Sequence, residues 1–187
     1  MKKGSKTPSK MRSLKDVRIF FALWPDDEVR HQIAENLKLF NLDRNNGRFV
    51  TIANLHMTLH FVGNTSFAEM SCLDFQARLT EAKPFNLTLD CSGYFKKPQV
   101  LWFGCDTIPQ ALYDLHRHLG QHLKICAYTP ESRPYSPHVT VARKIFEAPE
   151  TVPIEPISWR VDRFVLVKSI SISGGVRYEV VESYALG

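Results

Sequence analysis

The chain has 187 residues, of which 44% are hydrophobic and 23% are charged, and its formal net charge is +5. This length allows one well-formed core and is too short for two ordinary domains. No stretch approaches the roughly 18 uninterrupted apolar residues of a membrane-spanning helix, so we expect a soluble protein with no membrane partner.

Residues 1–16, MKKGSKTPSKMRSLKD, form a segment rich in lysine and arginine. It lacks the apolar core of a secretory signal. We expect a disordered basic tail followed by a single domain over residues 17–187. The alternative is a basic arm that contacts RNA, but the positive charge alone is a weak argument for a polyanionic partner.

The first half of the expected domain alternates β-branched and aromatic runs with one amphipathic helix. The run VRIFFAL predicts a strand, and Pro25 with three following acids begins a helix whose apolar residues recur at helical spacing. A turn follows at Asn45-Asn46-Gly47. The expected elements are a strand at 17–23, a helix from 25 to 40, a short strand at 48–52 and a stronger strand at 55–62.

The second half repeats this mixture and adds two hairpins. One hairpin turns at Lys96-Lys97-Pro98 and the other around Gly174-Gly175. The expected elements are helices at 66–82 and 108–126, and strands at 85–95, 99–106, around 138–143, 158–172 and 176–185. This order favours an α+β fold with a mainly antiparallel sheet over a doubly wound parallel one.

Four cysteines are present, at positions 72, 91, 105 and 126. They form no C-x-x-C pair and have no histidines at zinc-finger spacing. We expect them to be small, buried, reduced side chains in a cytoplasmic protein, with no metal site.

A short pattern occurs twice: LHMTLHFVG at residues 55–63 and PHVTVAR at residues 137–143 both contain His-x-Thr. Side chains alternate between the two faces of a strand, so His56 lies on one face with Thr58, and His138 lies with Thr140. The two histidines are 82 residues apart, one in each half of the chain. This spacing suggests two pseudo-equivalent lobes whose imidazoles face each other.

Two imidazoles with pKa values near ~6.5 suit a reaction that needs an acid and a base at the same time. Hydrolysis of a phosphodiester has this requirement. Threonine hydroxyls can donate hydrogen bonds to the non-bridging phosphate oxygens, where negative charge builds up. Such a site requires no metal.

These residues resemble the two-histidine (2H) phosphoesterase superfamily, whose paired signatures are H-x-T-L-x-F-x-G and P-H-x-T-L-A-R. The branch most similar is the RNA 2′,3′-cyclic phosphodiesterases, also called 2′-5′ RNA ligases. The resemblance extends through the strand RIFFAL and the strand VLWFG, over most of residues 17–185. It implies a LigT-like fold, in which two pseudo-symmetric lobes of mainly antiparallel sheet with outer helices face each other across a central cleft.

The resemblance also implies a role for each motif residue. His56 matches the general acid for the 3′-oxygen leaving group, and His138 matches the residue that activates water. Thr58 and Thr140 match the phosphate-binding threonines, and Arg143 matches an arginine that supplies positive charge. The implied enzyme is a monomer that opens 2′,3′-cyclic phosphate ends of RNA to 2′-phosphates without a cofactor or a metal, and it can also join such ends to a 5′-hydroxyl.

Two other functions stay open. The first is the same chemistry on another small nucleotide, such as ADP-ribose cyclic phosphate or 2′-5′ oligoadenylate. The second is a module that binds RNA ends without turnover. For Arg143 the alternative is a salt bridge at the strand end, because strict alternation from His138 turns it to the back of the sheet.

Several further side chains have both a structural and a functional interpretation. Strict alternation places His60 at the cleft edge on the face of His56. Phe61 is expected in the core rather than stacked on a base, while Trp102 and Tyr135 are undecided between the two. A solvated surface is expected for the remaining histidines, which are His31, His116, His118 and His122, and for the lysines at 96 and 97.

Overall fold

The computed structural model describes residues 17–40, 42, 47–150 and 152–187. The predicted basic tail at 1–16 and most of the predicted turn at 45–47 therefore lie outside the described residues. The elements are β1 (Val17–Leu23), α1 (Asp27–Leu37), β2 (Arg48–Phe49), η1 (Ile52–Asn54), β3 (Met57–Thr65), α2 (Phe67–Arg78), β4 (Phe85–Leu89), β5 (Cys91–Phe95), β6 (Val100–Gly104), α3 (Gln110–Leu123), η2 (Lys124–Cys126), β7 (Val139–Arg143), β8 (Ile157–Val161), β9 (Arg163–Ile172) and β10 (Gly175–Ala185).

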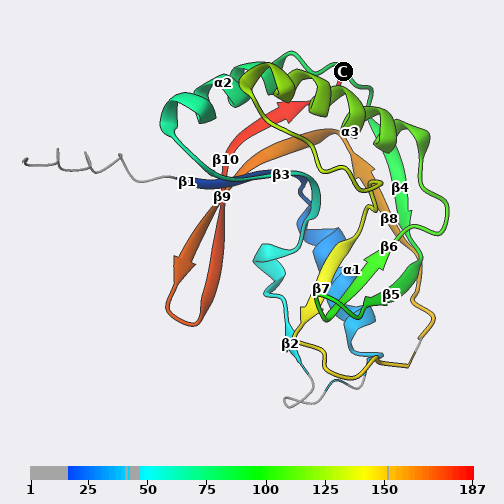
Figure 1. Ribbon diagram of the computed structural model, residues 1–187. Coiled ribbons are helices and arrows are strands. Elements are labelled where there is room, and N and C mark those ends of the chain that lie inside the picture. The colour runs from blue at the N-terminus through cyan, green and yellow to red at the C-terminus, as the bar shows by residue number, and fades with distance from the viewer. Residues whose placement is uncertain (1–16, 41, 43–46, 151) are drawn as a thin grey trace, which may run out of the picture.

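One large sheet runs through the molecule in the order β10-β9-β1-β3-β7-β6-β5, with β2 paired to β7, and β4 pairs with β8 in a second sheet. Every strand pair is antiparallel. Helices α2 and α3 lie together over one side of the sheet, and the β9–β10 hairpin projects away from them (Figure 1). The predicted α+β fold with mainly antiparallel strands is confirmed, and the two motif strands, β3 and β7, are neighbours in the large sheet.

Two long predicted strands are each broken in two. The run 85–95 divides at Asp90 into β4 and β5, and the run 158–172 divides at Asp162 into β8 and β9. The Asp90 carboxylate accepts a hydrogen bond from the Asp106 amide at 2.7 Å, and the Asp162 carbonyl accepts one from Leu186 at 2.8 Å. The first parts of the two runs pair with each other, which is why the structure has a second sheet.

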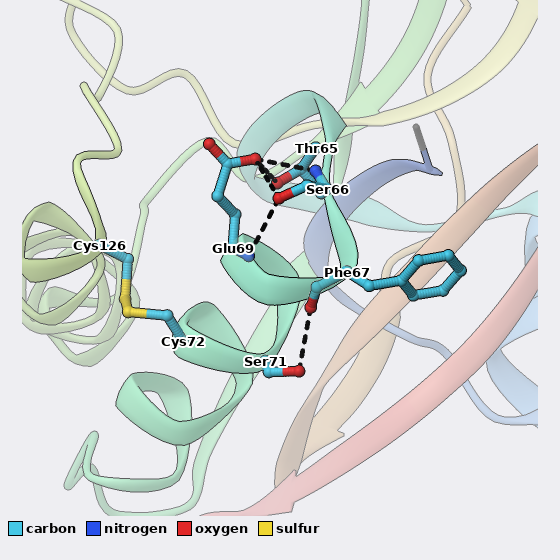
Figure 2. The surroundings of a disulfide bond; sticks show 7 residues. All are labelled: Thr65, Ser66, Phe67, Glu69, Ser71, Cys72 and Cys126. Atoms are coloured by element: carbon cyan, nitrogen blue, oxygen red, sulfur yellow. Dashed lines mark hydrogen bonds between the residues drawn. A yellow bond between two sulfur atoms is a disulfide. The ribbon is translucent and has the colours of Figure 1, made fainter. Parts of the chain in front are cut away.

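The three helices are shorter than the predicted ranges. Helices α1 and α3 bury their predicted apolar faces, whereas α2 buries Leu73 and Ala77 and leaves Phe67 exposed. Asp26 caps α1 by accepting a hydrogen bond from the Val29 amide at 2.9 Å. Ser66 and Glu69 form a reciprocal capping box at the start of α2 (Figure 2), an arrangement that satisfies amides without helical partners. No helix in the described part of the chain is long and apolar enough to span a membrane.

The expectation of four reduced cysteines is wrong for two of them. Cys72 on α2 and Cys126 on η2 form a disulfide, with their Cα atoms 5.9 Å apart (Figure 2). Cys91 and Cys105 are free thiols, and Cys105 is buried. The paired residues are 54 positions apart in the sequence, and they meet because α2 packs beside α3.

Candidate active site

The two motifs meet at the centre of the large sheet. Strands β3 and β7 pair through Met57 and Val139, which are both fully buried beneath the helices. Extending this antiparallel register by one residue sets His56 opposite Thr140 and Thr58 opposite His138. Alternation places all four side chains on the face away from Met57 and Val139. The histidines are then diagonal neighbours, for which separations of roughly 7–8 Å are usual, with the Cβ atoms somewhat closer.

Each motif strand contains a bulge at the same place. The pairing of β3 with β1 skips Leu59, and the pairing of β7 with β6 skips Val141. Both skipped residues lie three positions after the motif histidine, and the residue after each is buried as well. A bulge inserts one extra residue and so reverses the alternation beyond it. The fifth residue after each histidine therefore returns to the histidine's face.

The first bulge corrects two expectations. His60 does not line a cleft edge: it is 3% exposed, and its Nε2 donates to the carbonyl of His116 on α3 at 2.8 Å. Phe61 is not a core residue: it is 42% exposed and lies beneath the guanidinium of Arg18 at 4.9 Å. Phe61 pairs with Phe20, which itself contacts His56, so Phe61 lies on the side of the site.

The second bulge, in β7, gives Arg143 the position that Phe61 has in β3. Arg143 is exposed, and its positive charge contributes to lowering the pKa of both His56 and His138. An electrostatic effect on both imidazoles requires that Arg143 lies near them. The back-facing orientation that strict alternation predicted is therefore wrong.

His56 is held in a nearly closed aromatic setting. Its Nδ1 is 2.7 Å from the carbonyl oxygen of Asn54; a carbonyl only accepts, so Nδ1 carries the proton and Nε2 is left for substrate. The ring centroid lies 4.8 Å from that of Phe20, 5.9 Å from that of Trp24 and 5.1 Å from that of Tyr178, whose ring is nearly perpendicular. Burial lowers the pKa of His56 to about 4, and the charges of Arg143 and His138 act in the same direction.

His138 has the same orientation in a more open setting. Its Nδ1 donates to the carbonyl of Ser136 at 2.8 Å, again two residues before the histidine. Phe95 meets the ring edge-on at 5.1 Å, and Trp102 lies 6.3 Å away. Burial and the charge of Arg143 lower the pKa of His138, while the bond to Ser136 raises it. Trp102 is half-buried, and it lies beside the site.

A buried arginine supports the loop before His56, and the sequence reasoning missed it. Arg30 donates from Nε to the carbonyl of Pro25 at 2.8 Å and from Nη1 to the carbonyl of Ile52. Its guanidinium also lies over Trp24 at 5.1 Å, and both residues line an open pocket. The side chain of Asn54 bonds to strand β10. The sequence did contain a signal for this role, because Arg30 follows Val29 on the face of the predicted helix that is expected to be buried.

A second buried cluster lies behind β3 and corrects the expectation for His116. His116 is not on a solvated surface, because it stacks between His60 at 4.2 Å and Tyr135 at 3.9 Å. Burial lowers its pKa to about 4. The hydroxyl of Tyr135 donates to the carbonyl of Thr58 at 3.0 Å. Tyr135 is therefore a packing residue and does not face the site.

Metal ligation is not supported by any grouping of side chains. Among the residues that the structure describes, no three histidine, cysteine, aspartate or glutamate side chains gather to hold an ion. His118 and His122 lie one turn apart on α3 and belong to no such group.

Comparisons with known proteins give consistent results. The model of the 2′-5′ RNA ligase superfamily matches residues 25–171. An RNA 2′,3′-cyclic phosphodiesterase of Escherichia coli is 32% identical over 171 residues, which cover 90% of this chain and 96% of that protein. A protein of the same name from Thermotoga maritima is 27% identical and covers 88% of this chain and 93% of its own length.

Solved structures share the whole fold. E. coli LigT in complex with 3′-AMP superposes with a TM-score of 0.86 at 31% identity, covering 92% of this chain and 99% of that one. TT0787 of Thermus thermophilus superposes with a TM-score of 0.76 at 27% identity, covering 90% and 97%. The chain belongs to the 2′-5′ RNA ligase superfamily, and its fold is LigT-like.

Proposed function

We propose that this chain hydrolyses 2′,3′-cyclic phosphate ends of RNA to 2′-phosphates, with His56 and His138 as the acid and base. The observation that carries the proposal is the register of β3 and β7, which brings both His-x-Thr pairs to one face of the sheet. The names of the relatives point to the same substrate, a 2′,3′-cyclic phosphate in RNA.

The reaction balances with these two imidazoles alone. Neutral His138 takes a proton from water through Nε2 as the water oxygen forms a bond to phosphorus. The bond from phosphorus to the 3′-oxygen breaks, and protonated His56 gives its Nε2 proton to that oxygen. The product has a 2′-phosphate and a 3′-hydroxyl, and the two histidines exchange one proton with solvent to reset. The Thr58 and Thr140 hydroxyls and Arg143 stabilise the non-bridging oxygens.

The enclosure of His56 sets when it can act as an acid. With a pKa of about 4 the free imidazole is neutral at pH 7. A bound phosphate anion favours the imidazolium, and it does so strongly where water is excluded. His56 in this mechanism is therefore protonated by substrate binding, and the acid forms only where there is a phosphate to cleave.

Exposed positive charge near the second motif supports a polyanionic substrate. Arg48 and Arg143 are direct cross-strand partners, an arrangement of like charges that costs stability unless an anion lies nearby. Lys96 and Lys97 turn the neighbouring β5–β6 hairpin, and Lys144 follows β7. None of these five side chains forms an ion pair with a described residue. Exposed Phe61 offers a ring on which a base can stack.

Product analysis tests the proposal directly. The protein is incubated with 2′,3′-cyclic AMP and with a short RNA ending in a cyclic phosphate, each in excess EDTA, and the phosphate isomer is identified by ³¹P NMR. We expect the 2′-phosphate from both substrates. Formation of the 3′-phosphate, or a rate that disappears with EDTA and returns with a divalent ion, would contradict the proposal.

The two alternatives give different results in parallel assays. A related enzyme for another nucleotide would turn over ADP-ribose cyclic phosphate or 2′-5′ oligoadenylate faster than the RNA. A binding module would retain RNA in a salt-dependent way and release no product. Both motifs carry their histidine and threonine, which supports turnover over binding alone.

Our proposal also places the enzyme in the cytoplasm as a monomer. Light scattering after size-exclusion chromatography tests the monomer. Because disulfides are rare in the reducing cytoplasm, the state of the Cys72–Cys126 pair in cells tests this location. Rapid alkylation of cells before lysis, followed by mass analysis, shows whether the pair is reduced where the protein acts.

A further inference from the structure

We propose that Tyr135 is a positioning residue that holds the two half-sites at their working separation. This inference rests on the proposed function. The Tyr135 hydroxyl donates to the carbonyl of Thr58 in the first motif, and the next residue in the chain, Ser136, accepts the hydrogen bond that orients His138 in the second.

The ring of Tyr135 is fixed by stacking. It lies 3.9 Å from the ring of His116, and the planes are within 10° of parallel. His116 in turn stacks on His60 at 4.2 Å, and Tyr113 meets Tyr135 edge-on at 6.3 Å. Since His60 belongs to β3 and His116 to α3, the tyrosine is pinned to the back of the first motif's strand.

The hydroxyl of Tyr135 satisfies a backbone group where the sheet is interrupted. In the described chain β3 and β7 share the single register pair of Met57 with Val139. The carbonyl of Thr58, one residue further, accepts from the Tyr135 hydroxyl at 3.0 Å across 77 positions of sequence. Burial raises the pKa of Tyr135, so the hydroxyl keeps its proton and remains a donor. The bond therefore takes the place of a strand-to-strand hydrogen bond.

The other connection runs through the backbone. The residue after Tyr135 is Ser136, whose carbonyl accepts from Nδ1 of His138 at 2.8 Å. Prolines at 134 and 137 restrict the backbone on either side of this pair. A shift of the tyrosine ring therefore moves the acceptor that selects the tautomer of His138. Thr58 and His138 are then positioned by the two ends of one dipeptide.

Tyr128 provides a matched control. It lies in the same aromatic cluster, and its hydroxyl also makes one hydrogen bond, to Nδ1 of His60 at 3.3 Å. Its ring centroid lies 5.6 Å from that of His60, with the two rings nearly perpendicular. Replacing it with phenylalanine removes one buried hydroxyl from the same region without touching Thr58 or Ser136.

The experiment compares Tyr135→Phe with Tyr128→Phe. Steady-state kinetics on 2′,3′-cyclic AMP should show kcat reduced about tenfold in Tyr135→Phe, with KM changed less than about twofold, because the loss is of alignment and not of a substrate contact. Tyr128→Phe should retain kcat within about twofold. The thermal unfolding midpoints of both variants should fall by similar amounts, since each loses one hydrogen bond.

A second measurement needs no substrate. Proton-detected ¹⁵N NMR of the histidine rings follows the tautomer and the pKa of His138. Because the bond to Ser136 raises this pKa, a loosened Ser136 should lower it and increase the Nε2-protonated tautomer in Tyr135→Phe, while Tyr128→Phe should match the parent protein. The pKa of His56 should be unchanged in both.

Three results would overturn the positioning role: equal kcat losses in the two variants, an unchanged His138 titration in Tyr135→Phe, or loss of the fold in Tyr135→Phe alone, which would make the hydroxyl purely structural. Failure of the proposed function is distinguishable from these. In that case His138 would still respond to Tyr135→Phe by NMR, and the parent protein would not turn over the cyclic phosphate.

Discussion

The two His-x-Thr strands repeat one backbone design. In each, the histidine bonds through Nδ1 to the carbonyl two residues earlier, and a bulge three residues later brings the fifth residue back to the same face. The side chains at equivalent positions differ. The fourth residue is His60 in one strand and Ala142 in the other, and the fifth is Phe61 in one and Arg143 in the other.

The surroundings of the two histidines differ in the same way. His56 lies among three aromatic rings with a pKa of about 4, and His138 lies more openly beside two. The backbone thus supplies two imidazoles in the same orientation, and the side chains around them set different protonation behaviour. The enclosure alone keeps His56 neutral, so its role as the acid in our proposal requires a bound phosphate to protonate it.

The largest effect is expected from removing either imidazole. His56→Ala and His138→Ala should each lower turnover of 2′,3′-cyclic AMP by about 10²-fold or more, because each loses its proton-transfer group. Circular dichroism should show both folded. Near-normal rates in either variant would mean that the two halves do not act together.

The next largest effect distinguishes Arg143 from Phe61, the fifth residues after the two motif histidines. Arg143→Gln should lower kcat/KM roughly 10- to 100-fold through a lost charged hydrogen bond. It should also shift the pH profile. Both histidine pKa values are lowered in the free enzyme, partly by Arg143, so kcat/KM should peak below pH 6.5 and fall as pH rises; without the charge both pKa values rise and the peak moves to higher pH.

Phe61→Ala is the control for that shift. It should raise KM several-fold through lost base stacking, with the pH of the peak unchanged, because no charge is removed. A profile that moves equally in the two variants would show that the fifth positions are not electrostatically different.

The disulfide lies behind the first motif only, and its removal should affect stability without affecting chemistry. Closing a loop of this length contributes about 4 kcal/mol, so Cys72→Ser should lower the unfolding midpoint by roughly 10 °C. Calorimetry measures this change, and kcat at 25 °C should stay within about twofold. A large loss of kcat would indicate that the helices behind β3 help to align the site.

The smallest effect concerns His60, the fourth residue after His56, and His116, which stacks on it. His60 and His116 both have lowered pKa values in the folded protein, so the unfolded chain takes up protons first as pH falls. The contribution of this pair to the free energy of unfolding should be fully present above about pH 6.5 and decline toward pH 4. His116→Gln should flatten the dependence of the unfolding midpoint on pH between these values, whereas an unchanged slope would exclude the pair as its source.

The sequence was sufficient for the fold class, the hairpins and the faces of His56 and His138. Alternation and helical spacing are local rules, and they held where no bulge or distant contact interrupted an element. They failed where contacts from distant elements decide. Asp90 and Asp162 divide two apolar runs because their polar groups bond elsewhere, and nothing in the runs themselves indicates a change of sheet.

The bulges explain most of the errors in the site. Neither contains a glycine, so no residue announces the extra position, and strict alternation then assigned His60, Phe61 and Arg143 to the wrong faces. Comparing the two motifs with each other contained a usable signal, since Arg143 and Phe61 occupy equivalent positions. The Tyr135 contact depends on packing across 77 positions and had no such signal, whereas the only signal for Arg30 was its place on the buried helix face.

A substrate that needs no acid tests most directly whether the two imidazoles carry out opposite proton transfers. In a cyclic nucleotide with sulfur in place of the 3′-oxygen, the leaving group is a thiolate, which needs no proton. We expect His56→Ala to turn this substrate over at nearly the rate of the parent protein, while His138→Ala stays at least about 10²-fold slower. Rescue of His138→Ala instead, or of neither variant, would contradict the assignment of His56 as acid and His138 as base.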